Sequence, residues 1–196
     1  MTTIVVVRKG DTAVIAADSL TTFGTTRLAP AYDRHPQKIT GYGDSFLGVA
    51  GSAAHQLVLE NLLARTPNLD LHGKAAIYDT FRKLHPILKD EAFLNPKEEE
   101  DDPYESSQMT VMVANPSGVF AVYSMREVFE FDRFWAIGSG RDFALGAMYT
   151  LYGNAKSAAA VAEAGVLAGA EFDTGTSMPV TLREVALKMG SGTHSR

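Results

Sequence analysis

Short apolar runs rich in β-branched residues alternate with turn residues at the start of the chain. Turn residues at 9–11 and 43–44 separate two pairs of these runs, at residues 4–7 with 13–17 and at residues 37–42 with 45–50. Runs of this length, joined by turns that contain Gly–Asp, predict two β-hairpins. This part of the chain is therefore expected to form antiparallel strands.

The spacing of the apolar residues then lengthens to that of a helix. Ala54, Val58 and Leu62 recur every four residues, which predicts an amphipathic helix. A second helix is expected over residues 73–88, where Pro86 either strains the end or stops the helix earlier. Both helices follow the two predicted hairpins directly.

The second half of the chain again places strands before helices. Strands are expected at residues 109–114, 119–123, 127–131, 134–137 and 180–185, and helices at 141–152 and 157–170. The acidic run 95–103, bracketed by prolines, is expected to be a loop. Segregated strands and helices are typical of α+β proteins. We therefore expect a four-layer αββα sandwich, in which two sheets stack face to face and helices cover their outer faces.

Length and composition favour one folded domain. The chain has 196 residues, so residues 1–189 are expected to form a single domain and the polar tail 190–196 to be disordered. A net charge of -5 argues against nucleic-acid and membrane partners. The absence of cysteine excludes disulfides and thiolate sites. With no bilayer-spanning apolar run and no signal-peptide pattern, a cytoplasmic protein is expected.

The first hairpin brings candidate chemistry to the start of the chain. A three-residue loop at 9–11 would pair Arg8 with Thr12. Extending this register pairs Thr2 with Asp18. Side chains paired in this way lie roughly 5 Å apart on one face of a sheet. A register shift of one residue would break the pairing.

Removal of Met1 would give Thr2 a free α-amine beside its own hydroxyl. Initiator methionine is usually cleaved when a small residue such as threonine follows it. An α-amino group has a pKa of about 7.7–8.0, which suits a general base near neutral pH. A hydroxyl activated by its own terminal amine is an established type of nucleophile. The alternative is that Thr2 is only the β-branched start of a strand.

The second hairpin adds a lysine to this region. Its two-residue turn places Lys38 opposite Val49, on a strand that is expected to be largely buried. A buried lysine needs a partner, and Asp18 is the available candidate. The ammonium would keep the Thr2 amine neutral and would favour a developing alkoxide. The alternative is an exposed lysine on the face of a sheet.

Several short motifs occur together in a recognisable order. They are Thr2-Thr3-Ile4-Val5, Val14-Ile15-Ala16-Ala17-Asp18-Ser19, Thr22-x-Gly24, Lys38-Ile39, Val49-Ala50-Gly51-Ser52-Ala53-Ala54 and Ile137-Gly138-Ser139-Gly140. In order and rough spacing the chain resembles proteasome β-type subunits from Thr2 to Val185. With only Met1 ahead of the threonine, it is most similar to the bacterial HslV branch and to related bacterial proteasome homologues. The resemblance implies the αββα fold of N-terminal nucleophile hydrolases.

The resemblance also implies a role for each candidate residue. Thr2 would be the nucleophile and its amine the base. Asp18 and Lys38 would form the ion pair that orients and tunes it. The backbone N–H of Gly51 would form the oxyanion hole, where substrate backbone must come close. Ser139 would form a hydrogen bond near the threonine amine.

The last acid of the implied site is an aspartate before the final strand. If the chain is matched to the family pattern backwards from that strand, this aspartate is Asp173, which we prefer. If it is matched forwards from the preceding helix, the position falls on Glu171 or Phe172. Thr176 would stand where the family has a serine. The Gly-Ser-Gly at 138–140 has an alternative interpretation as a phosphate-binding loop, but the residues that would complete such a motif are missing.

Substrate contacts follow from the same resemblance. Thr21 and Thr22 would pair with the main chain of a bound peptide, which adds like a strand. Val49 and Ala53 would line the first specificity pocket, which would admit an apolar side chain and leave a charged one without a partner. Alternatively, Val49 and Ala53 simply pack in the core. His35 is a further catalytic candidate, although a loop histidine is more often solvated.

The implied function is that of a threonine endopeptidase that hydrolyses unfolded polypeptides. The family assembles into stacked rings, here two rings of six or seven subunits, usually fed by an ATPase unfoldase. No cofactor and no metal site are expected. One alternative is an amidase for a small molecule, because residues 25–37 are longer than in the family and would narrow the cleft. The other is a catalytically silent ring subunit, against which the joint presence of Thr2, Asp18, Lys38 and Ser139 argues.

Overall fold

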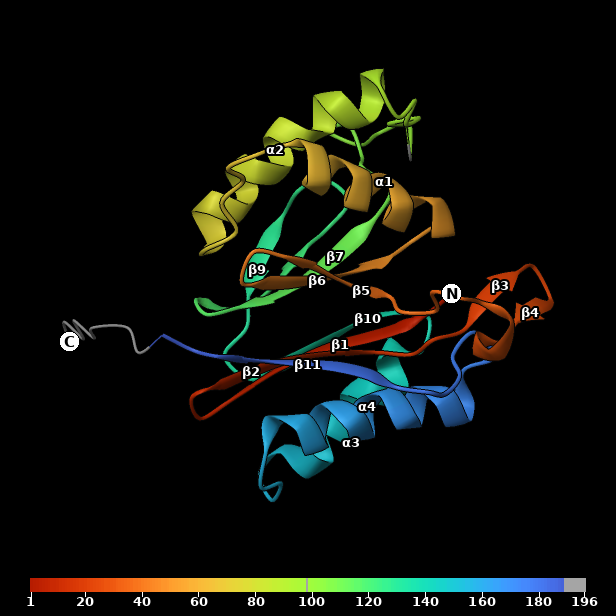
Figure 1. Cartoon of the computed structure of the whole chain (residues 1–196), viewed down its shortest axis with the longest axis vertical. Coiled ribbons are helices and arrows are strands. Elements are labelled where there is room, and N and C mark those ends of the chain that lie inside the picture. Colours follow the sequence, from red (N-terminus) through yellow and green to blue (C-terminus); the bar gives the residue numbers. More distant parts are fainter. Residues whose placement is uncertain (98, 189–196) are drawn as a thin grey trace.

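Two β-sheets stack face to face with a pair of helices on each outer side, as Figure 1 shows. The computed structural model describes residues 1–97 and 99–188. This arrangement confirms the predicted four-layer αββα sandwich. The prediction for the tail 190–196 lies outside the described residues.

The first sheet carries the start of the chain at its centre. Its strand order is β10 (Phe134–Gly138), β1 (Thr3–Lys9), β2 (Thr12–Ala17) and β11 (Thr181–Ala186), with antiparallel neighbours throughout. Helices α3 (Arg141–Tyr152) and α4 (Ala158–Phe172) cover its outer face. Because β1 is covered on both faces, its residues form a continuous apolar run rather than an alternating one.

The second sheet contains five strands and packs against the other two helices. Its order is β5 (Ile39–Tyr42), β6 (Ser45–Ala50), β7 (Thr110–Asn115), β8 (Gly118–Val122) and β9 (Val128–Glu130). Helices α1 (Ala53–Arg65) and α2 (Lys74–Asp90) lie over its outer face. A small hairpin of β3 (Thr21–Phe23) and β4 (Thr26–Leu28), followed by the 3-10 turn η1 (Pro30–Tyr32), projects at the end of the sandwich where the N-terminus lies.

Side chains from both sheets fill the space between them. Ile4 and Val6 of β1 face Met112 and Ala121 of the second sheet across this layer. Glycine at position 48 lets the two sheets pack tightly, because an added Cβ would lie 3.0 Å from Ile4 Cγ2. Close packing here fixes the position of β1, and so of the residues that precede it.

The predicted register of the first hairpin is wrong by one residue. Lys9 pairs with Thr12, so the turn has two residues, Gly10 and Asp11, rather than three. Gly10 adopts a φ of 63°, as the first position of a type II′ turn requires, and such tight turns match the twist of the strands. In the true register Thr3, not Thr2, lies opposite Asp18, whose N–H donates to the Thr3 carbonyl at 3.2 Å.

Two other expectations differ from the structure. Helix α2 continues through Pro86 to Asp90. Proline has no N–H, so one backbone carbonyl in the preceding turn lacks its usual partner, but Pro86 lies on the exposed side of the helix, where water can replace it. The β3–β4 hairpin was not predicted because its strands are short, mostly polar and only half-buried or exposed. The described helices include none that is long and apolar enough to span a bilayer.

Candidate active site

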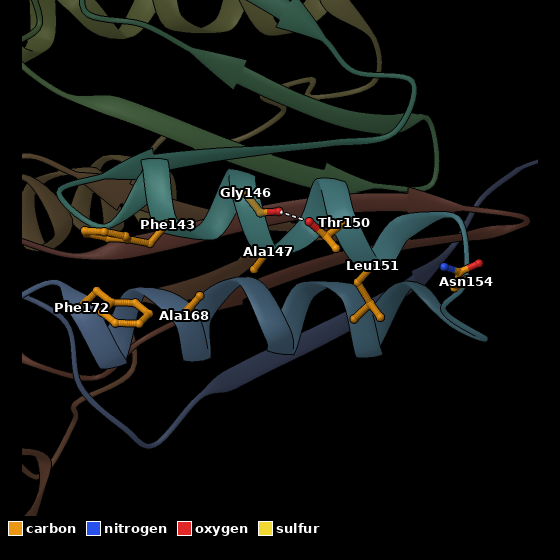
Figure 2. Close-up of a pocket in the computed structure, with 8 residues that line it drawn as sticks. All are labelled: Phe143, Gly146, Ala147, Thr150, Leu151, Asn154, Ala168 and Phe172. Carbon is orange, nitrogen blue, oxygen red and sulfur yellow. Dashed lines mark hydrogen bonds between the residues drawn. The ribbon is translucent and has the colours of Figure 1, made fainter.

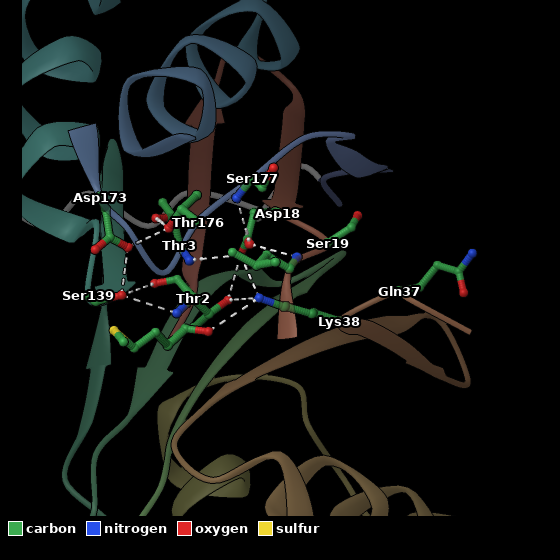
Figure 3. Close-up of polar contacts among 12 residues, drawn as sticks. Thr2, Thr3, Asp18, Ser19, Gln37, Lys38, Ser139, Asp173, Thr176 and Ser177 are labelled. Carbon is green, nitrogen blue, oxygen red and sulfur yellow. Dashed lines mark hydrogen bonds and ion pairs between the residues drawn. The ribbon is translucent and has the colours of Figure 1, made fainter. Parts of the chain in front are cut away.

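Thr2 lies immediately before β1 and is almost completely buried, with 5 % of its surface exposed. Its hydroxyl donates to Asp18 Oδ1 at 2.8 Å and accepts a hydrogen bond from Lys38 Nζ at 2.9 Å (Figure 3). The oxygen therefore sits between an anion and a cation, and the ammonium is placed to stabilise negative charge on it.

Asp18 follows the last residue of β2 and is fully buried. Besides the Thr2 hydroxyl, it accepts hydrogen bonds from Lys38 Nζ at 2.8 Å and from the backbone N–H groups of Thr3, Leu20 and Ser177. A buried carboxylate is tolerated only when its charge and lone pairs are satisfied in this way. Asp18 is therefore held rigidly by three different segments of the chain.

Lys38 precedes β5 and points at the same two groups (Figure 3). Burial lowers the pKa of Lys38, and this effect outweighs the opposing attraction of Asp18. A lysine with a lowered pKa releases a proton more readily than a solvated one. The Lys38 side chain is therefore suited to exchange a proton with, or stabilise, the Thr2 oxygen.

The backbone nitrogen of Thr2 is held from the other side. It donates to Ser139 Oγ at 3.2 Å, and Ser139 Oγ in turn donates to Asp173 Oδ2 at 2.7 Å. Burial acts to raise the pKa of Asp173, but hydrogen bonds from Thr176, Ser139 and the Gly175 N–H outweigh it and hold that pKa below its usual value. Asp173 therefore stays ionised, and at 2.7 Å from Ser139 Oγ it attracts the Ser139 proton more strongly than the Thr2 carbonyl at 3.4 Å does.

The geometry favours Asp173 over its neighbours as the last acid of the candidate site. Asp173 is the C-cap of α4, where the chain leaves the helix and turns toward Ser139 (Figure 3). Glu171 and Phe172 are exposed in the last turn of α4. Thr176, expected at a family serine position, donates to Asp173 Oδ2 at 2.6 Å.

The first glycine of the Gly-Ser-Gly motif is needed because the backbone of Thr2 lies close to it. Gly138 adopts a φ of 92°, and an added Cβ would lie 2.8 Å from the carbonyl carbon of Thr2. The strand β10 can therefore approach Thr2 this closely only with glycine at this position. The motif serves close packing and the placement of Ser139.

Gly51 lies between β6 and α1, directly before the N-cap residue Ser52. Its φ of 153° favours glycine, and an added Cβ would lie 2.9 Å from His55 Nδ1. Burial lowers the pKa of His55, so its neutral ring accepts from the Ser52 N–H at 3.1 Å. Gly51 is thus held at the N-terminal end of a helix, where backbone N–H groups favour a developing oxyanion.

The residues expected to contact substrate lie on surrounding elements. Thr21 and Thr22 are half-buried in β3, and Ala53 is exposed as the first residue of α1. Val49 is half-buried and packs against the hydrophobic cluster beneath α1 and α2, which agrees with the alternative that this residue packs in the core. His35 is exposed in the loop after η1 and is not in the Thr2 network.

One hydrogen-bonded network therefore joins the five residues expected to be catalytic: Thr2, Asp18, Lys38, Ser139 and Asp173. Gly51 and the substrate candidates lie outside it. Sequence reasoning missed the backbone donors to Asp18, which belong to Thr3, Leu20 and Ser177. Thr3 and Ser177 act through contacts across the fold. In residues 1–97 and 99–188, no three His, Asp or Glu side chains are arranged to hold a metal ion.

A separate groove of about 610 Å³ runs along the outer helices. Figure 2 shows its lining, which comes from α3, α4 and the turn between them: Phe143, Gly146, Ala147, Thr150, Leu151, Asn154, Ala168 and Phe172. It contains no member of the Thr2 network. The charged side chains of the Thr2 network therefore lie at the end of the sandwich and not in this groove.

Comparison with known proteins gives a consistent result. No protein-family model matches the chain, and no curated protein matches it. Two structures of Thiobacillus denitrificans BPH, one in complex with epoxomicin, are 38% identical over 95% of this chain and 99% of theirs, with TM-scores of 0.90 and 0.89. Eukaryotic HslV from Trypanosoma brucei shares the fold, with 22% identity over 94% of this chain and 99% of its own, and a TM-score of 0.70.

Proposed function

The chain belongs to the proteasome β-type family, with its N-terminal nucleophile hydrolase fold, and from this premise we propose that it is a threonine-type peptidase with Thr2 as nucleophile. The observation that carries the proposal is the placement of Thr2. Its hydroxyl lies between Lys38 Nζ and Asp18 Oδ1, while its own nitrogen is held by Ser139. A threonine needed only for packing would not require charged groups on both sides of its oxygen.

Removal of Met1 starts the proposed mechanism, because it converts the Thr2 nitrogen into a free amine. The amine accepts the proton from Oγ1, and Oγ1 attacks the substrate carbonyl carbon. Lys38 and the Gly51 N–H stabilise the negative charge that develops on the attacking and carbonyl oxygens. The amine then protonates the departing amino group, and water hydrolyses the resulting ester of Thr2.

Substrates of this site are proposed to be unfolded polypeptides. The β3 residues Thr21 and Thr22 offer main-chain groups to an extended peptide, and Val49 with Ala53 offers it a small apolar surface. The similar BPH of Thiobacillus denitrificans is in complex with epoxomicin. This supports a peptidase assignment over that of a silent subunit.

We further propose that the chain self-assembles into stacked rings that enclose the active sites, in the manner of its family. The number of subunits per ring stays open between six and seven, and an ATPase unfoldase is the proposed feeding partner. Confinement makes physical sense because an exposed nucleophile of low selectivity would attack other proteins.

Peptide hydrolysis in a Thr2→Ala variant tests the proposal. We expect the wild-type protein to cleave short fluorogenic peptides in preference to small amides, and Thr2→Ala to lose this activity while native mass spectrometry shows the same assembly. Cleavage retained in Thr2→Ala would point to another nucleophile. Turnover of small amides alone would favour the amidase alternative.

A further inference from the structure

Thr3 is fully buried beside the nucleophile and has no role in the mechanism above. Because successive residues of a strand point to opposite faces, its side chain turns away from Lys38. It faces the α3–α4 side, where its Oγ1 lies 2.7 Å from Thr176 Oγ1 (Figure 3). The two consecutive threonines therefore contact different halves of the site.

The direction of the hydrogen bond between Thr3 and Thr176 follows from counting protons. Each hydroxyl has one proton, and Thr176 uses its own to donate to Asp173 Oδ2, since an ionised carboxylate only accepts. Thr3 must therefore donate to Thr176. The same Asp173 oxygen accepts the proton of Ser139, which leaves a Ser139 lone pair facing the Thr2 nitrogen.

These bonds form one directed chain. It runs from the Thr3 hydroxyl through Thr176 to Asp173, where it meets the bond from Ser139. The Thr3 donor strengthens the bond from Thr176 to Asp173 Oδ2, and that bond fixes the position of the oxygen that also accepts the Ser139 proton. Thr3 thus acts on the orientation of the Ser139 proton without touching the nucleophilic oxygen.

The fold encloses the Thr3 side chain between two glycines. A Cβ added to Gly169 of α4 would lie 3.0 Å from Thr3 Cγ2, and one added to Gly140 at the start of α3 would collide with Thr3 Oγ1. The Thr3 hydroxyl consequently has little freedom to rotate away from Thr176. The Thr3 N–H also donates to Asp18 Oδ1 at 3.0 Å, which ties the same residue to the other side of the site.

We propose that Thr3 is a positioning residue that directs the hydrogen bonds around the terminal amine of Thr2. This inference rests on the proposed function. If Thr3 did not donate to Thr176, the Thr176 hydroxyl would be freer to rotate, and the Asp173 carboxylate that holds the Ser139 proton would be fixed less firmly. A Ser139 proton turned toward the amine would occupy the lone pair that must accept the Thr2 proton.

Two substitutions that differ by a single hydroxyl test this role. Thr3→Ser keeps the donor and loses only a methyl group, whereas Thr3→Ala loses both. We expect Thr3→Ala to lower kcat about tenfold or more, with KM within twofold of wild type, because the base is misplaced but the substrate surface is intact. Thr3→Ser is expected to recover most of kcat.

Thr80→Ala is the matched control for a purely structural loss. Thr80 is 3 % exposed, and its hydroxyl donates to the Asp70 carbonyl at 2.7 Å, in α2 and away from Thr2. Its loss should lower the Tm and leave kcat unchanged. If Thr3→Ala behaves in the same way, the positioning role is overturned while the proposed function stands. If wild-type protein shows no Thr2-dependent hydrolysis at all, the proposed function fails and this inference fails with it.

Discussion

At the scale of single residues, the site is a buried charge pair with a hydroxyl between its members. Asp18 and Lys38 are 0 % and 9 % exposed, and the pair is held by hydrogen bonds from separate segments of the chain. Buried ion pairs add little net stability, but removing one partner is costly because the other charge remains. The presence of this pair is explained better by the chemistry proposed for Thr2 than by folding stability.

Lys38→Met tests this view. The variant leaves Asp18 buried without a counter-charge, so we expect unfolding stability to fall by about 3 kcal/mol. Peptide hydrolysis is expected to fall at least a hundredfold, since the cation beside Oγ1 is lost. Chemical denaturation and steady-state kinetics measure the two effects. Lys83→Met, at an exposed position of α2, is the control and should change neither; wild-type activity in Lys38→Met would contradict the assignment.

The contact between Thr2 and Asp18 was predicted through a register that is wrong by one residue. It forms nevertheless, because Thr2 precedes the paired part of β1 and its side chain reaches diagonally to the carboxylate beyond β2. Thr3 could not have been assigned from sequence, since nothing local indicates that its hydroxyl meets Thr176 far along the chain. Motif resemblance located Asp173 and Ser139, but only the fold shows how they are joined.

At the scale of elements, close approach between strands decides where Thr2 lies. The helices could be predicted within a few residues because their apolar spacing is clear, and the second hairpin because its Gly–Asp turn is unambiguous. The β3–β4 hairpin has no such pattern and depends on its neighbours for burial. The position of β10 against Thr2 depends on Gly138, whose importance appears only in three dimensions.

Gly138→Ala should therefore damage both stability and activity. A φ of 92° costs a non-glycine residue about 1–3 kcal/mol, and the new Cβ would push Thr2 away from Ser139. Thermal unfolding and peptide hydrolysis check this expectation. Gly146→Ala in α3 is the control, because no atom lies within 4 Å of the added Cβ. Its free energy of unfolding should increase by about 0.5–1 kcal/mol. A Gly138→Ala protein with the Tm and activity of wild type would disprove the close-approach argument.

Helix α2 carries a group that makes folding sensitive to pH. His85 is buried, its Nε2 contacts Glu105, and burial lowers its pKa below 6.5 despite that carboxylate. At pH values between the folded and unfolded pKa of His85, the unfolded chain binds more protons than the folded protein. The stability that the neutral His85 contributes is therefore lost as the pH falls below 6.5. The Tm of wild type should thus decrease more between pH 7 and pH 5.5 than that of His85→Leu. Equal decreases in both proteins would contradict this expectation.

At the scale of the whole molecule, four layers bring residues from both ends of the sequence to one end of the sandwich. Thr2 and Asp173 are far apart in the chain, but β1 lies beside β10 and packs against α4, so the loop after α4 comes close to the start of the chain. The four-layer arrangement and the existence of the two hairpins could be predicted from the sequence. The convergence of these segments could not, because it depends on sheet order rather than on any local pattern.

The central claim is that a free amine on Thr2 activates its own hydroxyl. Intact mass followed by peptide mapping, before and after incubation with epoxomicin, tests it most directly, because BPH with 38% identity is in complex with this compound. We predict a chain that lacks Met1 and gains one epoxomicin, located at Thr2, with no gain in Thr2→Ala. A wild-type chain that retains Met1, or that gains no mass at Thr2, would contradict the account.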